Sequence, residues 1–232
     1  MVPNRSSDSS SIVKTLKAMA NPKNVEGMVR FGISPNNTLG VSIPVLRKIA
    51  KEFGKNHQLA QELWDSEIHE ARILAGLIAD PKLLTEKQMD LWVKDFDSWD
   101  VCDQVCMNLF DKTEFAYRKA VEWTVSEEEF VRRAGFALMA VLAVHDKKIP
   151  DSKLEACYPL IEKYAYDDRN FVRKAVNWAL RQIGKRNKNL NRSAIQVAEK
   201  ILKQDSKSAK WIANDALREL KSEAVQKRLN KN

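Results

Sequence analysis

The chain has 232 residues, of which 44% are hydrophobic and 30% are charged, so it can bury a sizeable core and solvate the rest. Only 7 glycines and 7 prolines occur, and no glycine-rich phosphate-binding motif is present, which argues against an all-β fold, a Rossmann-type fold and a nucleotide site. The formal net charge of +8 favours a polyanionic partner, most commonly nucleic acid; a basic protein without such a partner is the alternative.

In chain order, residues 1–11 are expected to form a flexible N-terminal arm, and the pattern that follows is helical. In residues 41–56, for example, Val45, Ile49 and Phe53 fall on one apolar stripe. Helices are predicted at residues 11–20, 41–56, 57–66, 66–80, 85–96, 98–110, 113–125, 126–145 and 171–186. No segment shows the alternation typical of a strand, so we predict an all-α protein.

The helical segments also repeat. EEEFVRRAGFALMA resembles DRNFVRKAVNWALR, which aligns Phe130 with Phe171, and residues 179–181 are echoed at 216–218. A period of about 40 residues with two helices per unit is typical of HEAT or armadillo repeats. We therefore predict a single α-solenoid domain of HEAT-like repeats over residues 12–225, curved with a basic concave groove, and a basic C-terminal tail at 226–232.

Cysteine usage indicates a reducing compartment. Cys102, Cys106 and Cys157 form no C-x-x-C motif and no even-numbered disulfide framework. Cys102 and Cys106 are spaced as two metal ligands could be, but no histidine lies within the same turn. We expect small core residues there, and no metal or cofactor. No apolar run could span a membrane and no secretory signal is evident, so we expect a cytoplasmic protein, nucleoid-associated in a bacterium.

Histidines do not indicate an enzyme of another class. His57, His69 and His145 show neither the H-E-x-x-H spacing nor a catalytic triad. We expect His69, next to Glu70 on a polar helix face, to have a surface or capping role.

The predicted helix at 171–186 carries a basic stripe. Lys174, Trp178, Arg181 and Lys185 share one face, and seven basic residues and no acid occur between positions 173 and 192. An indole among cations suits phosphate contacts beside a stacking surface. The alternative is a solvated basic face with Trp178 packed into a neighbouring helix.

The predicted helix at 128–143 is almost wholly apolar after Arg133, so we expect it to be a buried inner helix. Arg132 and Arg133 lie in its first turns, and at least one should point out toward the groove. A structural pair with Asp100, Asp103 or a glutamate is the alternative.

The stretch DSWDVCDQ contains three acids that we expect to differ in role. Asp97 or Ser98 fits an N-cap and Asp100 fits an acidic first turn. Asp103 is too far along the helix to cap it, and it shares a face with Trp99. A carboxylate beside an indole fits a cationic ligand, and a structural Asp–Arg pair is the alternative.

The stretches SWDVCDQV, FVRRAGFALM and FVRKAVNWALRQIGK, in this order and spacing, resemble the AlkD-like DNA alkylation repair proteins, which are built from HEAT-like repeats. The resemblance runs from about residue 12 to residue 218. It implies a DNA glycosylase that excises positively charged bases such as 7-methylguanine and 3-methyladenine, without a metal and without flipping the base into a pocket. The implied partner is double-stranded, alkylated DNA, bound by a monomer, with no membrane involved.

The resemblance also implies residue roles. Asp103 matches the catalytic aspartate, Trp99 and Trp178 match tryptophans that pack against the lesion nucleotide's backbone, and Arg133 matches an arginine that contacts DNA near the lesion. Phe31 falls where the family carries a tyrosine, and Ser98 stands where it has a second tryptophan. Further candidates for DNA backbone contacts are Phe31, Arg132, Lys174, Arg181, Lys185 and Arg186. A non-catalytic binder of branched or distorted DNA and a HEAT scaffold for protein partners are the alternative functions.

Overall fold

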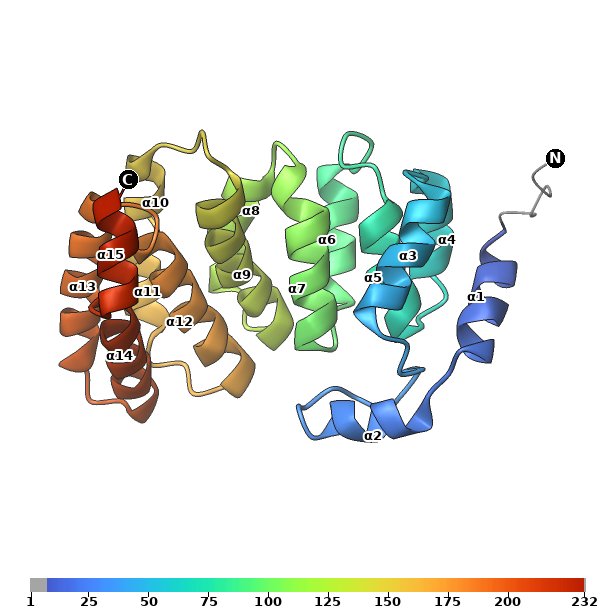
Figure 1. Cartoon of the computed structure of the whole chain (residues 1–232), viewed down its shortest axis with the longest axis horizontal. Coiled ribbons are helices and arrows are strands. Elements are labelled where there is room, and N and C mark those ends of the chain that lie inside the picture. Colours follow the sequence, from blue (N-terminus) through green and yellow to red (C-terminus); the bar gives the residue numbers. More distant parts are fainter. Residues whose placement is uncertain (1–7, 232) are drawn as a thin grey trace. The chain divides into compact units, whose positions relative to one another are not determined.

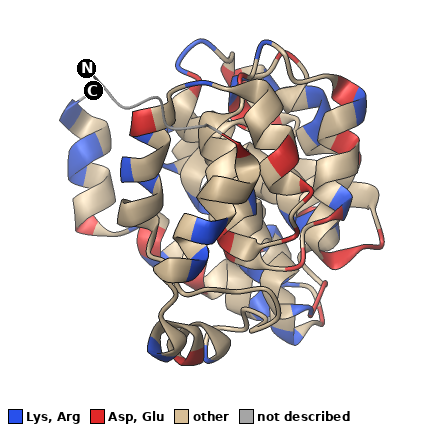
Figure 2. Cartoon of the chain, turned by 90° about the vertical axis from the view of Figure 1, so that its right-hand side faces the viewer, with Lys and Arg blue, Asp and Glu red and all other residues tan. Residues whose placement is uncertain are grey.

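The computed structural model describes residues 8–231, and every regular element assigned in that range is helical (Figure 1). The prediction of an all-α protein is confirmed. The chain divides into two compact units, Met1–Thr113 and Glu114–Asn232, each of which is described by itself. The prediction of one repeat domain over residues 12–225 stays a prediction. Along the chain, the helices carry Lys and Arg interspersed with Asp and Glu (Figure 2).

The first unit contains α1 (Ser9–Ala18), α2 (Pro22–Val29), α3 (Ile43–Phe53), α4 (His57–Trp64), α5 (His69–Ile78), α6 (Glu86–Lys94), α7 (Trp99–Asn108) and the 3₁₀ turn η1 (Phe110–Lys112). Side-chain caps begin several of them: Asp8, Asn21, Asn56 and Thr85 each accept a hydrogen bond from a backbone N–H in the first turn.

The N-terminal boundary differs from the prediction of a flexible arm over residues 1–11. Asp8 Oδ1 accepts hydrogen bonds from Ser11 N at 2.7 Å and Ser10 Oγ at 2.8 Å, so α1 begins at Ser9. Residues 9–11 therefore belong to a helix, because a good N-cap precedes them. The rest of the predicted arm, residues 1–7, lies outside the described residues.

Helix α5 is the centre of the first unit and packs against α3, α4 and α7. Its Ile73 and Leu74 are buried, as are Val101 and Val105 of α7. A Cβ on Gly76 would lie 3.0 Å from the Val105 side chain, so the missing side chain lets α5 and α7 pack closely. This packing fixes α7, the helix that carries Trp99 and Asp103.

The second unit contains α8 (Ala116–Glu122), the 3₁₀ turn η2 (Trp123–Val125), α9 (Glu129–His145), α10 (Asp151–Glu155), α11 (Tyr158–Tyr164), α12 (Asn170–Gly184), α13 (Lys188–Leu202), α14 (Lys207–Leu220) and α15 (Glu223–Lys231). Residues 131–143 of α9 are all buried, which confirms that this helix is buried, as its apolar sequence predicts. The predicted C-terminal tail is helical over residues 226–231, within α15, where Val225 and Leu229 are buried.

Cys102 and Cys106 lie in the core, as the sequence predicts. All three cysteines are buried, and burial raises the pKa of the Cys157 thiol to about 12, which leaves it an unreactive core group. Within residues 8–231, no helix combines the length and apolar character needed to cross a membrane.

Candidate nucleic-acid interface

The N-terminus of α7 brings Trp99 next to Phe31. Ser98 is the N-cap, and Trp99 is the first residue of the helix. The Trp99 Nε1–H group donates a hydrogen bond to the backbone oxygen of Phe31 at 3.1 Å. Trp99 and Asp103 are one turn apart and half-buried, off the buried stripe of Val101 and Val105. The structure therefore places Phe31, which is 72% exposed, beside Trp99.

Asp100 has a structural partner that the sequence did not reveal. Its carboxylate lies 2.9 Å from Nε2 of His69, which is buried, so the expectation of a surface or capping role for His69 is wrong. Burial raises the pKa of Asp100, but the hydrogen bond and charge of His69 more than offset this, and the pKa is lowered. Burial lowers the pKa of His69, and the hydrogen bond to Asp100 with the charges of Asp100, Glu70 and Asp97 raises it overall.

Glu70 holds the loop that follows Phe31. Its buried carboxylate accepts hydrogen bonds from the backbone N–H groups of Leu39, Gly40 and Val41 at 2.9, 2.6 and 3.2 Å. These donors are backbone groups from a distant part of the sequence, so no side-chain pattern pointed to them. Glu70 and the neighbouring His69–Asp100 pair thus hold this loop and the start of α7 in place.

Arg132 has a structural role in the second unit. It is 4% exposed, and its guanidinium lies 2.6 Å from Asp167 Oδ2 and 3.1 Å from Glu127 Oε1, and 4.6 Å from the centre of the Tyr164 ring. The alternative of a structural pair with an acid holds, although the main partner is Asp167. We therefore withdraw Arg132 from the candidate DNA contacts, because a buried, paired guanidinium cannot reach a phosphate.

Arg133 is also buried, at 5% exposure. Its Nη1 donates a hydrogen bond of 2.6 Å to the backbone oxygen of Phe171, which links α9 to the first turn of α12. Its contact with DNA stays a prediction, and it requires DNA to approach the start of α12.

Two cations of the predicted basic stripe lie against acids of α14. Arg181 is 2.5 Å from Glu219 and 3.6 Å from Asp215, and Lys185 is 2.6 Å from Glu219. Burial raises the pKa of Glu219, but the hydrogen bond from Lys185 and the charge of Arg181 lower it overall. We call this line of contacts the α12–α14 seam. The acids come from a different helix, so the absence of acids between positions 173 and 192 does not leave Arg181 and Lys185 unpaired.

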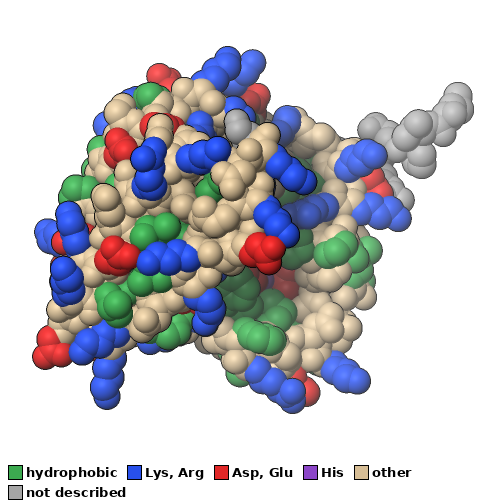
Figure 3. Space-filling model, turned by 60° about the vertical axis from the view of Figure 1, so that its left-hand side comes forward, with side chains coloured by type: hydrophobic (Ala, Val, Ile, Leu, Met, Phe, Trp, Pro, Cys, Tyr) green, Lys and Arg blue, Asp and Glu red, His purple; other side chains and the backbone are tan. Residues whose placement is uncertain are grey.

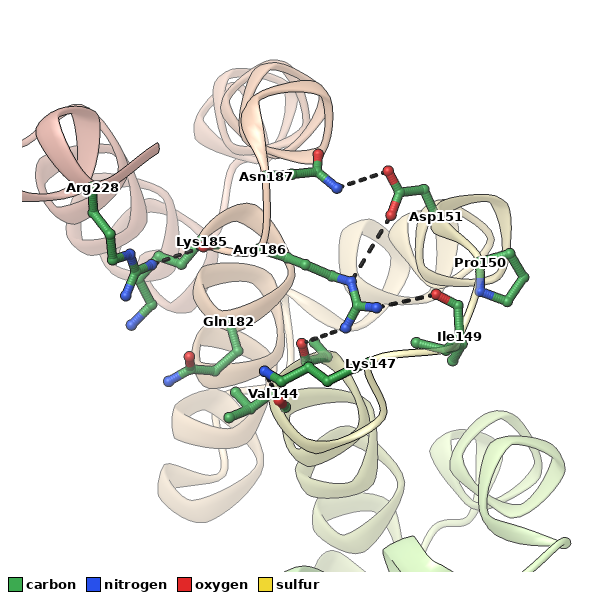
Figure 4. Close-up of a pocket in the computed structure, with 11 residues that line it drawn as sticks. Val144, Lys147, Ile149, Pro150, Asp151, Gln182, Lys185, Arg186, Asn187 and Arg228 are labelled. Atoms are coloured by element: carbon green, nitrogen blue, oxygen red, sulfur yellow. Dashed lines mark hydrogen bonds and ion pairs between the residues drawn. The ribbon is translucent and has the colours of Figure 1, made fainter. Parts of the chain in front are cut away.

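Arg186 closes the C-terminal end of α9 (Figure 4). Its guanidinium donates hydrogen bonds to the backbone oxygens of Ala143, Asp146 and Ile149 at 2.9, 2.8 and 3.2 Å. It lies at a cavity of about 630 Å³ whose other lining residues include Lys147, Gln182, Asn187 and Arg228. Carbonyls at the end of a helix need such donors, so Arg186 is a helix-capping residue and is withdrawn from the candidate DNA contacts.

Lys174 and Trp178 remain available on α12. Lys174 is exposed and Trp178 is half-buried. Neither side chain has a hydrogen bond, ion pair or ring contact within residues 8–231. The candidate residues are thus Phe31, Trp99 and Asp103 in the first unit, and Lys174 and Trp178 in the second unit. No group of three or more His, Cys, Asp or Glu residues that could hold a metal occurs in the described range.

These observations define an all-helical protein in which each unit carries aromatic and charged candidate side chains on its helices. The family model of the DNA alkylation repair enzymes matches residues 12–220, so the chain belongs to that family.

Two similar proteins extend this finding. The chain is 24% identical over 190 residues to uncharacterized protein Lin0241 of Listeria innocua, an alignment that covers 80% of this chain and 83% of that protein. A solved structure matches with a TM-score of 0.76 at 22% identity, covering 91% of this chain and 94% of the other. That protein is described as one of a new family related to the HEAT-like repeat DNA glycosylases, with affinity for branched DNA structures. This likeness confirms the HEAT-like fold.

Proposed function

We propose that the chain is a DNA glycosylase that binds double-stranded DNA as a monomer and excises cationic alkylated purines. The observation that carries this proposal is the face of α7 that Trp99 and Asp103 share. Asp103 lies one turn beyond the N-terminus of α7, where capping does not explain a carboxylate. An indole and a carboxylate on one face suit a ligand that carries positive charge.

The chemistry needs only these groups and water. Alkylation at N7 or N3 leaves the purine positively charged, so it departs with the electron pair of the breaking N-glycosidic bond as a neutral base. Positive charge develops on the deoxyribose, and the Asp103 carboxylate stabilises it, helped by aromatic faces. Water then bonds to the anomeric carbon and loses a proton. No acid is required to protonate the leaving group, so one carboxylate is enough, in contrast to glycosidases that expel an oxygen.

The test is release of 7-methylguanine from methylated duplex DNA, measured by liquid chromatography. We expect release by the wild-type protein and a loss of at least about 100-fold in Asp103→Asn, because removing one electrostatic stabiliser costs roughly 10²–10³ in rate. Asp97→Asn is the matched control, since Asp97 is exposed and precedes the same helix. Release by Asp103→Asn at the wild-type rate would contradict the proposed mechanism.

A second candidate function is binding of branched DNA without excision. The affinity for branched DNA of the protein with the similar fold favours it. Tight binding of a four-way junction by the wild-type protein, with no base released from methylated duplex, would favour this function. No DNA binding even at low salt would favour a scaffold for protein partners.

A further inference from the structure

The α12–α14 seam has an exception at its N-terminal end. Going back along α12 from Lys185, Arg181 pairs with acids and Asn177 donates a 2.7 Å hydrogen bond to Asp215. One turn earlier, Arg173 meets an indole instead: its guanidinium carbon lies 4.7 Å from the centre of the Trp211 ring. Its other contact is a 3.3 Å hydrogen bond to Asn170, so Arg173 has no ion pair within residues 8–231.

Two exposed lysines without ion pairs within residues 8–231 lie next to this exception along α12 and α14, whereas the neighbouring Lys210 pairs with Asp205. Trp211 is 39% exposed, which is unusual for an indole that could have been buried in the seam. Lys174 lies beside Arg173 on α12, and Lys207 lies one turn before Trp211 on α14; both are exposed, and neither forms an ion pair in the described part of the chain. Figure 3, which turns the left-hand side of Figure 1 forward, shows Lys and Arg side chains spread over this side, with hydrophobic and some acidic side chains between them.

The same position recurs in consecutive repeats. The alignment that places Phe130 on Phe171 also places Arg133 on Lys174, and the one that places residues 179–181 on 216–218 places Lys174 on Trp211. One position near the start of α9, α12 and α14 therefore carries an arginine, a lysine and a tryptophan. These are residue types used to contact nucleic acid backbones and bases.

We propose that Arg173, Lys174, Lys207 and Trp211, which we call the α12–α14 corner, bind the sugar–phosphate backbone of a duplex DNA arm. The three cations contact phosphates, and the indole packs against a deoxyribose, held in place by the guanidinium over its ring. The proposal rests on the proposed binding of DNA, but not on base excision. It would give the second unit a contact with DNA of its own.

The first experiment measures the dissociation constant of a fluorescent four-way junction by anisotropy as a function of salt. Two charge-matched variants are compared, K174Q/K207Q in the corner and K200Q/K203Q at the exposed C-terminal end of α13. Each lost phosphate contact removes about 0.9 from the slope of log K against log salt, so the corner variant should lose about 2 and the control should keep the wild-type slope. Equal losses in the two variants would overturn the proposal, because net charge alone would then explain them.

The second experiment separates the indole from the charges. Trp211→Ala should weaken junction binding about tenfold without changing the salt slope, since stacking or packing on an indole releases no counterions. Leu202→Ala, at an exposed apolar residue of α13, is the control and should bind as wild type. Circular dichroism checks that both variants fold. Wild-type affinity in folded Trp211→Ala would overturn the proposal, whereas failure of the wild-type protein to bind any DNA would overturn the proposed function itself.

Discussion

At the scale of single residues, Asp100 of the stretch DSWDVCDQ has a structural role, as the sequence predicts. The side chain that gives it this role lies elsewhere in the chain. The sequence predicts helix-start chemistry for Asp100, and its carboxylate does accept a hydrogen bond from Val101 N at 3.0 Å. Its main partner is His69. A sequence pattern can place Asp103 past the first turn, but it cannot show which histidine meets Asp100, because only the packing of α5 on α7 brings the two together.

The His69–Asp100 pair predicts a pH-dependent stability. The raised pKa of His69 contributes stability that is present below its ordinary value of 6.5 and lost as pH rises through its folded value. The lowered pKa of Asp100 contributes stability that is present above its ordinary value of 3.8 and lost as pH falls through its folded value. The pair should therefore stabilise the fold most between these limits.

Urea denaturation across pH tests this expectation. At pH 6, His69→Asn should lower the free energy of unfolding by about 3 kcal/mol, because it leaves the largely buried carboxylate of Asp100 without its charged partner. The difference from wild type should shrink as the pH rises through the raised pKa of His69, because the imidazole then loses its charge. His57→Asn is the control, since His57 is hydrogen-bonded to the neutral amide of Gln88 at 3.1 Å. A difference that stays constant between pH 6 and pH 9 would show that the pair is not ionised.

At the scale of elements, the connection from α2 to α3 is more constrained than its sequence suggests. Three backbone N–H groups bind Glu70, and Gly40 has a φ of +77°. A Cβ at this position would lie 2.4 Å from the backbone oxygen of Asn21. The connection is therefore a fixed structural element, and it positions the segment that contains Phe31.

Gly40→Ala should destabilise the protein by about 2 kcal/mol or more, because it combines an unfavourable φ with a backbone clash. Hydrogen exchange should show faster exchange at the amides that bind Glu70. Gly27→Ala is the control: Gly27 lies within α2 with nothing within 4 Å of a Cβ, so alanine should stabilise the helix by about 0.5–1 kcal/mol. Unchanged amide exchange in Gly40→Ala would show that the loop tolerates the added side chain.

Two cations predicted to contact DNA should respond differently to mutation. Arg132→Met removes a cation that is buried against Asp167, so thermal or urea denaturation should show a loss of about 3 kcal/mol, with DNA affinity unchanged in the folded protein. Lys174→Gln removes an exposed cation, so it should lower DNA affinity and leave the stability within about 0.5 kcal/mol. Weaker DNA binding by folded Arg132→Met would return Arg132 to the interface.

At the scale of the whole molecule, the net charge of +8 predicts that DNA binding is electrostatic. If about five phosphates are contacted, log K should fall against log salt with a slope of about −4 to −5, a loss of several hundred-fold between about 50 and 200 mM salt. Titration of duplex and junction DNA over this range measures the slope. A slope near zero would show that the basic residues do not contact DNA phosphates.

The sequence by itself determined the helical fold, the repeat pattern, the buried α9 and the separation of Asp103 from the capping acids. These features follow from local periodicity and from composition, which act over one helix or one repeat. The apolar stripe of α3 shows the limit of such patterns: Val45 is 37% exposed, and the buried residue is Leu46, because α5 packs on the adjacent face.

Only the tertiary structure decided which charged residues are available. Arg132, Arg181, Lys185 and Arg186 look alike in the sequence, yet each binds an acid or a carbonyl supplied by another segment. Sequence patterns missed the partners of His69 and Glu70 and the Arg173–Trp211 contact for the same reason, since each partner lies on a different element, far along the chain. Periodicity assigns a side chain to a face of a helix, but whether its charge is neutralised depends on the helix that packs against that face.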